Sequence, residues 1–157
     1  MSLYAEGTST SESKSKVEID ELLRKWKSTN VAVGEGAAGA VVYFGIGQWQ
    51  VKFEVPMPSL GDAEKALKGK RSYHYPTTVQ KTAWVEQERR RRWRALLLTV
   101  KAKLVSVENA IETFEQAFLA HLVIEGGQTV GQRVLPAIAE TYKSGRVPNG
   151  GLLGAGA

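Results

Sequence analysis

A long run of apolar residues at heptad-like spacing constrains the fold more than any other feature of the sequence. The run is spaced alternately four and three residues apart, and Thr77 and Gln80 form a capping box ahead of it. These signals predict one long helix, from about residue 77 to 123. The run consists of Trp93, Leu97, Val100, Leu104, Val107, Ile111, Phe114 and Phe118, and a second apolar strip of Leu98, Ala102 and Val105 lies beside it. A helix that is apolar on two sides requires more than one partner, which we expect to be a sheet and either another helix or another subunit.

The segment before this helix has the alternation of an antiparallel sheet. Residues 31–34 are short and β-branched, and residues 40–46 are almost continuously apolar. Residues 49–55 alternate strictly between apolar and polar side chains, which is typical of a half-buried strand. The glycines between the last two segments predict a hairpin. We therefore expect three strands, the last of which ends at Pro56 because proline cannot donate to the ladder.

Two shorter helices are expected at the ends of the domain. Ser15 and Glu18 form a capping-box pattern that predicts a first helix over residues 16–28. Gly126 and Gly127 predict a tight turn before the last helix. This helix is capped by Thr129 and closed by Gly145 at about residue 144, and Pro136 either kinks it or marks its true start.

Residues 59–76 are polar with little periodicity, so they predict a surface loop and the first place to look for a binding loop. The complete order predicts an α+β fold: an N-terminal helix, a three-stranded antiparallel sheet, a long helix packed on the sheet and a short C-terminal helix. A chain of 157 residues corresponds to about one domain. We expect a flexible arm over residues 1–13, a single domain over 14–145 and a flexible tail over 146–157.

Composition limits the class of protein and the cellular compartment that we expect for the chain. Its apolar content of 43% and charged content of 24% match globular proteins, and it contains no cysteine. No run of residues is long and apolar enough to cross a bilayer, and the N-terminus is polar rather than signal-like. We therefore expect a cytoplasmic protein that does not insert in a membrane.

The most unusual local feature is the basic stretch EQERRRRWR, residues 86–94, in the first half of the long helix. Basic residues dominate residues 80–103, whereas residues 104–125 contain acids and neither Lys nor Arg. Four consecutive arginines point in all directions around a helix, so at least one must run beside the sheet or pair with a carboxylate. Arg90, Arg94 and Lys101 share one face, where guanidinium groups could bind phosphates.

Two interpretations of this stretch remain open. In the first, the chain binds nucleic acid, a partner that its net charge of +5 favours without proving. The second has the arginines in ion pairs, either within the chain or between subunits of a homo-oligomer formed through the long helix. The candidate nucleic-acid-binding residues are Arg89, Arg90, Arg94 and Lys101 on the helix, with Lys70, Arg71 and Tyr73 in the preceding loop.

Enzyme motifs are absent from the sequence. His74 and His121 have no Cys, Asp or Glu at metal-ligand spacing, and His121 fits a structural position beside the apolar run. Glu86 and Glu88 lack the upstream aspartate that a nuclease site would need, and the glycine-rich segment has no phosphate-loop lysine. We therefore predict no catalytic residue, no metal site and no cofactor.

Several short motifs resemble those of a family of small bacteriophage and prophage proteins of unassigned activity. The likeness covers nearly the whole chain, and it implies a phage-derived gene that acts in the bacterial cytoplasm. It implies no catalytic residue. The motifs are RWRALLL (92–98), KAKL (101–104), TFE (113–115) and FLA (118–120), with YAEGT (4–8) near the start and AETY (139–142) followed by Pro148 near the end.

Overall fold

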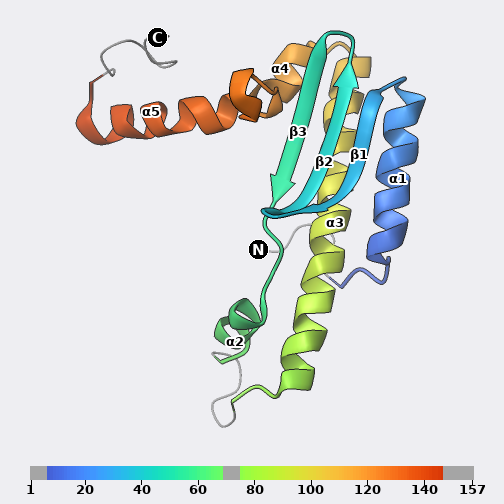
Figure 1. Cartoon of the computed structure of the whole chain (residues 1–157), viewed down its shortest axis with the longest axis vertical. Helices are drawn as coiled ribbons and strands as arrows, with labels where there is room; N and C mark the ends of the chain where they lie inside the picture. The colour runs from blue at the N-terminus through green and yellow to red at the C-terminus, as the bar shows by residue number, and fades with distance from the viewer. Residues whose placement is uncertain (1–6, 69–74, 147–157) are drawn as a thin grey trace.

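The computed structural model describes residues 7–68 and 75–146. A helix is followed by a three-stranded antiparallel sheet in the order β1-β2-β3 and then by further helices, so the predicted α+β class is confirmed (Figure 1). The elements are α1 (Glu12–Lys25), β1 (Thr29–Gly36), β2 (Gly39–Ile46), β3 (Trp49–Val55), α2 (Leu60–Lys68), α3 (Thr78–Glu108), α4 (Phe114–Phe118), the 3-10 turns η1 (Leu119–His121) and η2 (Glu125–Gly127), and α5 (Val130–Ser144).

The sheet confirms the three predicted strands and lengthens the first by two residues at each end. Strands β2 and β3 pair without interruption from Ala40 opposite Val55 to Ile46 opposite Trp49. Gly47, at the turn between them, has a φ of 57°, a conformation that glycine adopts without steric cost. Because side chains alternate along each strand, one face of the sheet carries the buried residues Ala40, Val42, Phe44, Val51 and Phe53.

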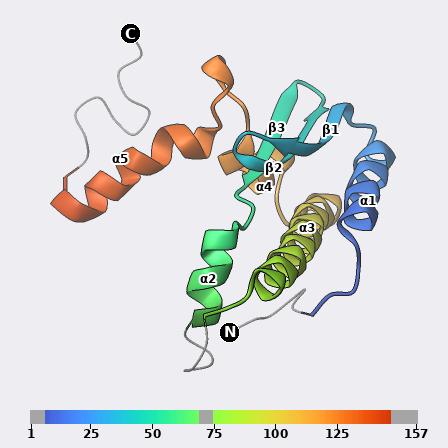
Figure 2. The same ribbon diagram turned by 60° about the horizontal axis from the view of Figure 1, so that its bottom comes forward.

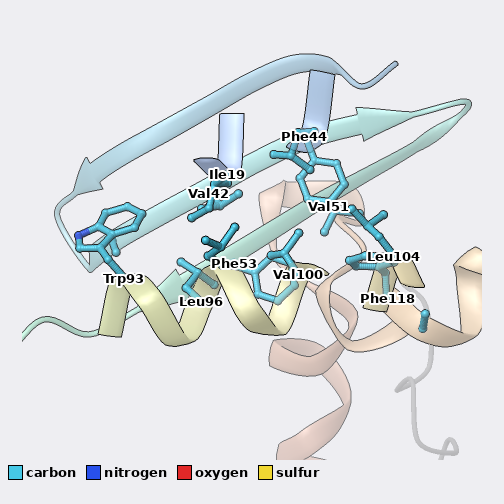
Figure 3. Packing of buried hydrophobic residues seen from close by; sticks show 14 of the residues in the cluster. Ile19, Val42, Phe44, Val51, Phe53, Trp93, Leu96, Val100, Leu104 and Phe118 are labelled. Atoms are coloured by element: carbon cyan, nitrogen blue, oxygen red, sulfur yellow. The ribbon is translucent and has the colours of Figure 1, made fainter. Parts of the chain in front are cut away.

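Helix α3 lies across this apolar face and supplies the other half of the core (Figure 3). Trp93 and Val100 are completely buried, and Leu104 is 1% exposed. The spacing of these positions therefore predicted correctly which side of the helix faces the sheet. From α1, Ile19 and Leu23 complete the core along one flank of α3.

The predicted length of the long helix was wrong. α3 ends at Glu108, and the backbone reverses through Ala110, whose φ of 55° is left-handed. Ile111 consequently lies outside the core with 74% of its surface exposed. Phe118 still reaches the core, but from the separate helix α4, where it packs edge-to-face on Phe44.

Two other boundaries also differ from the prediction. The first helix covers residues 12–25 rather than 16–28, because Ser11 caps it by accepting a hydrogen bond from the backbone of Lys14. Ser15, the predicted cap, is instead a buried residue inside the helix. Residues 1–6 of the predicted arm and residues 147–157 of the predicted tail lie outside the described residues, and Glu12 and Ser13 at the end of the predicted arm belong to α1.

The segment 59–76, predicted to be a loop, contains helix α2. Ser59 starts the helix through reciprocal hydrogen bonds with Asp62, in which the Ser59 amide donates to the carboxylate and the Asp62 amide donates to the hydroxyl. The Ser59 amide and the Ser59 hydroxyl, which also donates to the carboxylate at 2.7 Å, lower the pKa of Asp62. Ala63 is buried where α2 meets the rest of the chain.

The C-terminal part follows the prediction closely. Gly126 and Gly127 turn the chain with positive φ angles, a capping box at Thr129 starts α5, and the left-handed Gly145 ends it. Pro136 lies inside the helix, so it does not mark the start. The first turn of α5 packs on η1, and the rest extends away from the sheet (Figure 1). None of the described helices is long and apolar enough to cross a membrane.

Candidate functional site

The first half of α3 extends beyond the sheet and pairs with α2 (Figures 1 and 2). None of residues 78–92 is buried, in contrast to the core positions that begin at Trp93. Lys81 forms an ion pair of 3.6 Å with Glu64 of α2. We call α2 together with residues 78–92 the helical hairpin.

Positive charge is concentrated on this hairpin. Lys65 and Lys68 lie in the last turn of α2. The hairpin's described basic residues are Lys65, Lys68, Lys81 and Arg89–Arg92, and its acidic residues are Asp62, Glu64, Glu86 and Glu88. The predicted binding residues Lys70, Arg71 and Tyr73 belong to the segment that connects α2 to α3 and lie outside the described residues.

Arg89 is held in ion pairs with two other elements. Its guanidinium donates to both carboxylate oxygens of Glu12 on α1, at 2.9 and 3.1 Å, and also to Glu35 on β1. The hydrogen bonds with Glu12 are the main reason that the pKa of Arg89 is raised. The residue therefore ties α1, β1 and α3 together, as one of the two open interpretations of the arginine run proposed.

Arg94, five residues further along α3, also pairs with a carboxylate of α1. Its guanidinium donates to Glu18 of α1 at 2.7 Å, and about a third of the side chain is exposed. Lys101 lines the same groove between α1 and α3, where Glu21 and Lys25 are also found. Two of the three residues predicted to share a face therefore do share it, beside carboxylates.

The other three arginines are distributed around the helix. Arg91 and Arg92 both lie near Glu88, at 3.4 and 3.9 Å, and Arg92 also donates to the backbone carbonyl of Pro56. Within the described part of the chain, Arg90 makes no ion pair. Among the four consecutive arginines, Arg90 is therefore the one without an ion pair in the described chain. Its side chain lies on the face of α3 between Arg89 and Arg94.

Near the tip of the hairpin, Tyr75 is 77% exposed, and the ammonium of Lys68 lies 5.1 Å from the centre of its ring. The sequence interpretation selected Tyr73 and left out Tyr75, Lys65 and Lys68. A signal for the lysines was visible, because Ser59 and Asp62 have the spacing of a helix cap and place both lysines on a helix.

A second depression lies between β3 and α5, with an apolar lining that includes Leu135 and Ala139. The polar groups at its edge already pair with one another. Lys52 contacts Glu54 at 3.1 Å, and Gln132 donates to the same carboxylate at 3.0 Å. His121 stacks on Phe53 with ring centroids 3.9 Å apart, and burial lowers its pKa.

No group of His, Cys, Asp or Glu side chains suited to a metal ion occurs among the residues that the structure describes. Comparison of the chain with protein-family models, with curated proteins and with solved structures finds no match. The geometry and charge of the hairpin and of α3 are therefore the features of the described chain that indicate a function.

Proposed function

We propose that this chain is a non-enzymatic nucleic-acid-binding accessory protein of bacteriophage or prophage origin that acts in the bacterial cytoplasm. The observation that carries the proposal is the position of the basic residues. They project from the packed domain on two helices, along a part of α3 with no buried side chain. A projecting cationic element can approach a phosphate backbone without rearrangement of the core.

The proposed contacts combine charge and an exposed aromatic ring. Lys65 and Lys68 attract phosphates on the α2 side of α3, Arg90 does so on the α1 side, and the exposed ring of Tyr75 stacks on an unpaired base. Lys70, Arg71 and Tyr73, the loop candidates from the sequence, lie outside the described residues and stay a prediction. Such contacts favour single-stranded nucleic acid without selecting a base sequence.

In this proposal Arg89 and Arg94 do not contact phosphates. Both guanidinium groups bind carboxylates of α1, so contact with a phosphate would require them to leave these partners. Their role is to fix the angle between α1 and α3. Arg90 is the better test residue because its substitution breaks no ion pair of the described chain.

The experiment is a salt titration of binding, measured by fluorescence anisotropy with labelled single-stranded and duplex DNA. Reversal of Lys65 and Lys68 to Glu, or of Arg90 to Glu, should weaken binding to all sequences about equally. Each lost phosphate contact should flatten the salt dependence by about one unit. Lys143→Glu on α5 is the matched control for Arg90→Glu, since each changes the net charge by two units and Lys143 is exposed away from the hairpin.

Two results would contradict the proposal. The first is the absence of DNA or RNA affinity at about 50 mM salt, where phosphate contacts are strong. The second is an equal loss of affinity in Lys143→Glu and in the hairpin variants, which would indicate a response to net charge rather than to a surface.

A further inference from the structure

The side of α3 that faces away from the sheet carries an apolar strip, one member of which, Leu98, also lines the groove with α1. Helix α1 packs on one flank of α3 and α2 on the other, and the sheet lies opposite (Figure 2). Val105 is 44% exposed, Ala95 and Ala102 are exposed, and Leu98 is half-buried. We call these four residues the outer strip.

The outer strip has the spacing of a helix–helix interface. Its members follow one another at intervals of three, four and three residues, so they lie in one line on the helix. Two of the four are alanines, which allow the backbone of another helix to come close. Charged residues lie on both sides of the strip along α3, with Arg91 and Arg92 before it and Glu108 after it.

We propose that the outer strip packs against the outer strip of a second copy of this chain, with the two α3 helices antiparallel. The charge along α3 selects this partner and this direction. Arg91 and Arg92 lie on the N-terminal side of the strip, where they share the single carboxylate of Glu88, whereas Glu108 and Glu112 lie exposed beyond its C-terminal end. An antiparallel pair places the basic end of one helix beside the acidic end of the other.

The midpoint of the strip sets the register. If the two copies are related about residue 100, Ala95 faces Val105 of the second copy and Leu98 faces its Ala102. Glu108 of the second copy then lies level with Arg92 and one residue from Arg91. A parallel pair would instead place arginine beside arginine and glutamate beside glutamate, which is unfavourable in both places.

Lys101 is the residue that opposes the arrangement most directly, because the two copies of it come near the symmetry axis. Its side chain belongs to the groove between α1 and α3, where Glu18 and Glu21 are close. These carboxylates reduce the repulsion. The inference does not depend on nucleic-acid binding, since none of the outer-strip residues belongs to the proposed phosphate surface.

The first experiment measures self-association by sedimentation equilibrium over a range of concentrations. The wild type should dimerise, and Ala102→Glu should weaken the dimer by about tenfold or more, because it puts an unpaired charge into the contact. Ala83→Glu introduces the same change at an exposed position of α3 outside the strip, and the dimer should survive it. Circular dichroism confirms that both variants fold.

The second experiment tests direction by charge reversal. Arg91→Glu and Glu108→Arg should each weaken the dimer, and the double variant should restore it, because the opposite charges again face each other between copies. In a parallel dimer the double variant would bring no rescue.

The third experiment measures a distance. The chain has no cysteine, so Val79→Cys provides a single attachment point for a spin label at a position that is 79% exposed. Residue 79 lies 21 residues from the proposed axis, so at 1.5 Å per residue the two labels should be about 60 Å apart, against about 20 Å or less in a parallel pair. A wild type that stays monomeric at high micromolar concentration, a dimer insensitive to Ala102→Glu, or a short label distance would each overturn the proposal.

Discussion

The four consecutive arginines illustrate how position on a helix decides the role of a side chain. Successive residues point about 100° apart, so neighbours in the sequence meet different elements. Arg89 meets α1 and β1, whereas Arg92 meets the backbone of Pro56. Arg90 points about 100° away from Arg89 on the other side from Arg92, and of the four consecutive arginines it is the one without an ion pair in the described chain. A count of arginines therefore overstates the charge available to a ligand.

Leu104 tests the packing of the core. Leu104 is 1% exposed and belongs to the core cluster that also contains Phe118 of α4. Leu104→Ala should therefore lower the free energy of unfolding by about 2 to 5 kcal/mol. Urea denaturation measures this loss. Val79→Ala is the control, because this residue of α3 is 79% exposed and its truncation should cost less than about 1 kcal/mol. Equal losses would mean that the two side chains have similar surroundings.

His121 should make stability depend on pH. Burial lowers its pKa below the ordinary value of 6.5, and the nearby charge of Lys103 lowers it further, although the backbone of Lys52 acts in the opposite direction. The unfolded chain then binds the proton more readily than the folded chain. This contribution to stability is therefore complete above pH 6.5 and falls as the pH drops below that value.

The measurement compares urea denaturation of the wild type and His121→Gln between neutral and mildly acidic pH. The stability difference between the two proteins should change on acidification in favour of the variant, which has no group to titrate at this position. A difference that stays constant, or that moves in favour of the wild type, would contradict the assignment.

At the scale of elements, the break after α3 shows why helical spacing alone predicted the wrong length. The alternating spacing continues to Phe118, although the helix ends at Glu108. The chain reverses and α4 returns Phe114 and Phe118 to the same core, so burial recurs at a similar interval on both sides of the turn. A capping box at Thr113 was the available signal against one continuous helix.

That capping box should contribute measurably to stability. The hydroxyl of Thr113 accepts a hydrogen bond from the Gln116 amide at 3.2 Å, and the Gln116 side chain accepts one from the Thr113 amide at 2.9 Å. Thr113→Ala should cost about 1 kcal/mol. Thr99→Ala is the control, because its hydroxyl only donates to the carbonyl of Ala95 within α3. Thermal unfolding compares the two, and a smaller loss in Thr113→Ala would argue against the cap.

At the scale of the whole molecule, local patterns predicted the order of elements and the side of α3 that faces the sheet. They predicted less of the candidate site. Glu12 and Glu35 lie 77 and 54 residues from Arg89 in the sequence, and nothing local indicates that both meet it. The same limit applied to α2, whose only local signal was the short cap at Ser59. Contacts between distant segments decide which charges are exposed, and they follow from the tertiary fold.

The continuity of α3 also has a mechanical consequence. One unbroken helix joins the packed core to the projecting hairpin, so neither part can tilt without the other. From Trp93 to Thr78 the helix is about 22 Å long, so a tilt of about 10° at the sheet would carry its tip through about 4 Å. The ion pairs of Arg89 and Arg94 with α1 lie close to the point about which α3 would tilt. A force applied at the tip is therefore transmitted to α1 and β1, which come well before α2 and α3 in the sequence.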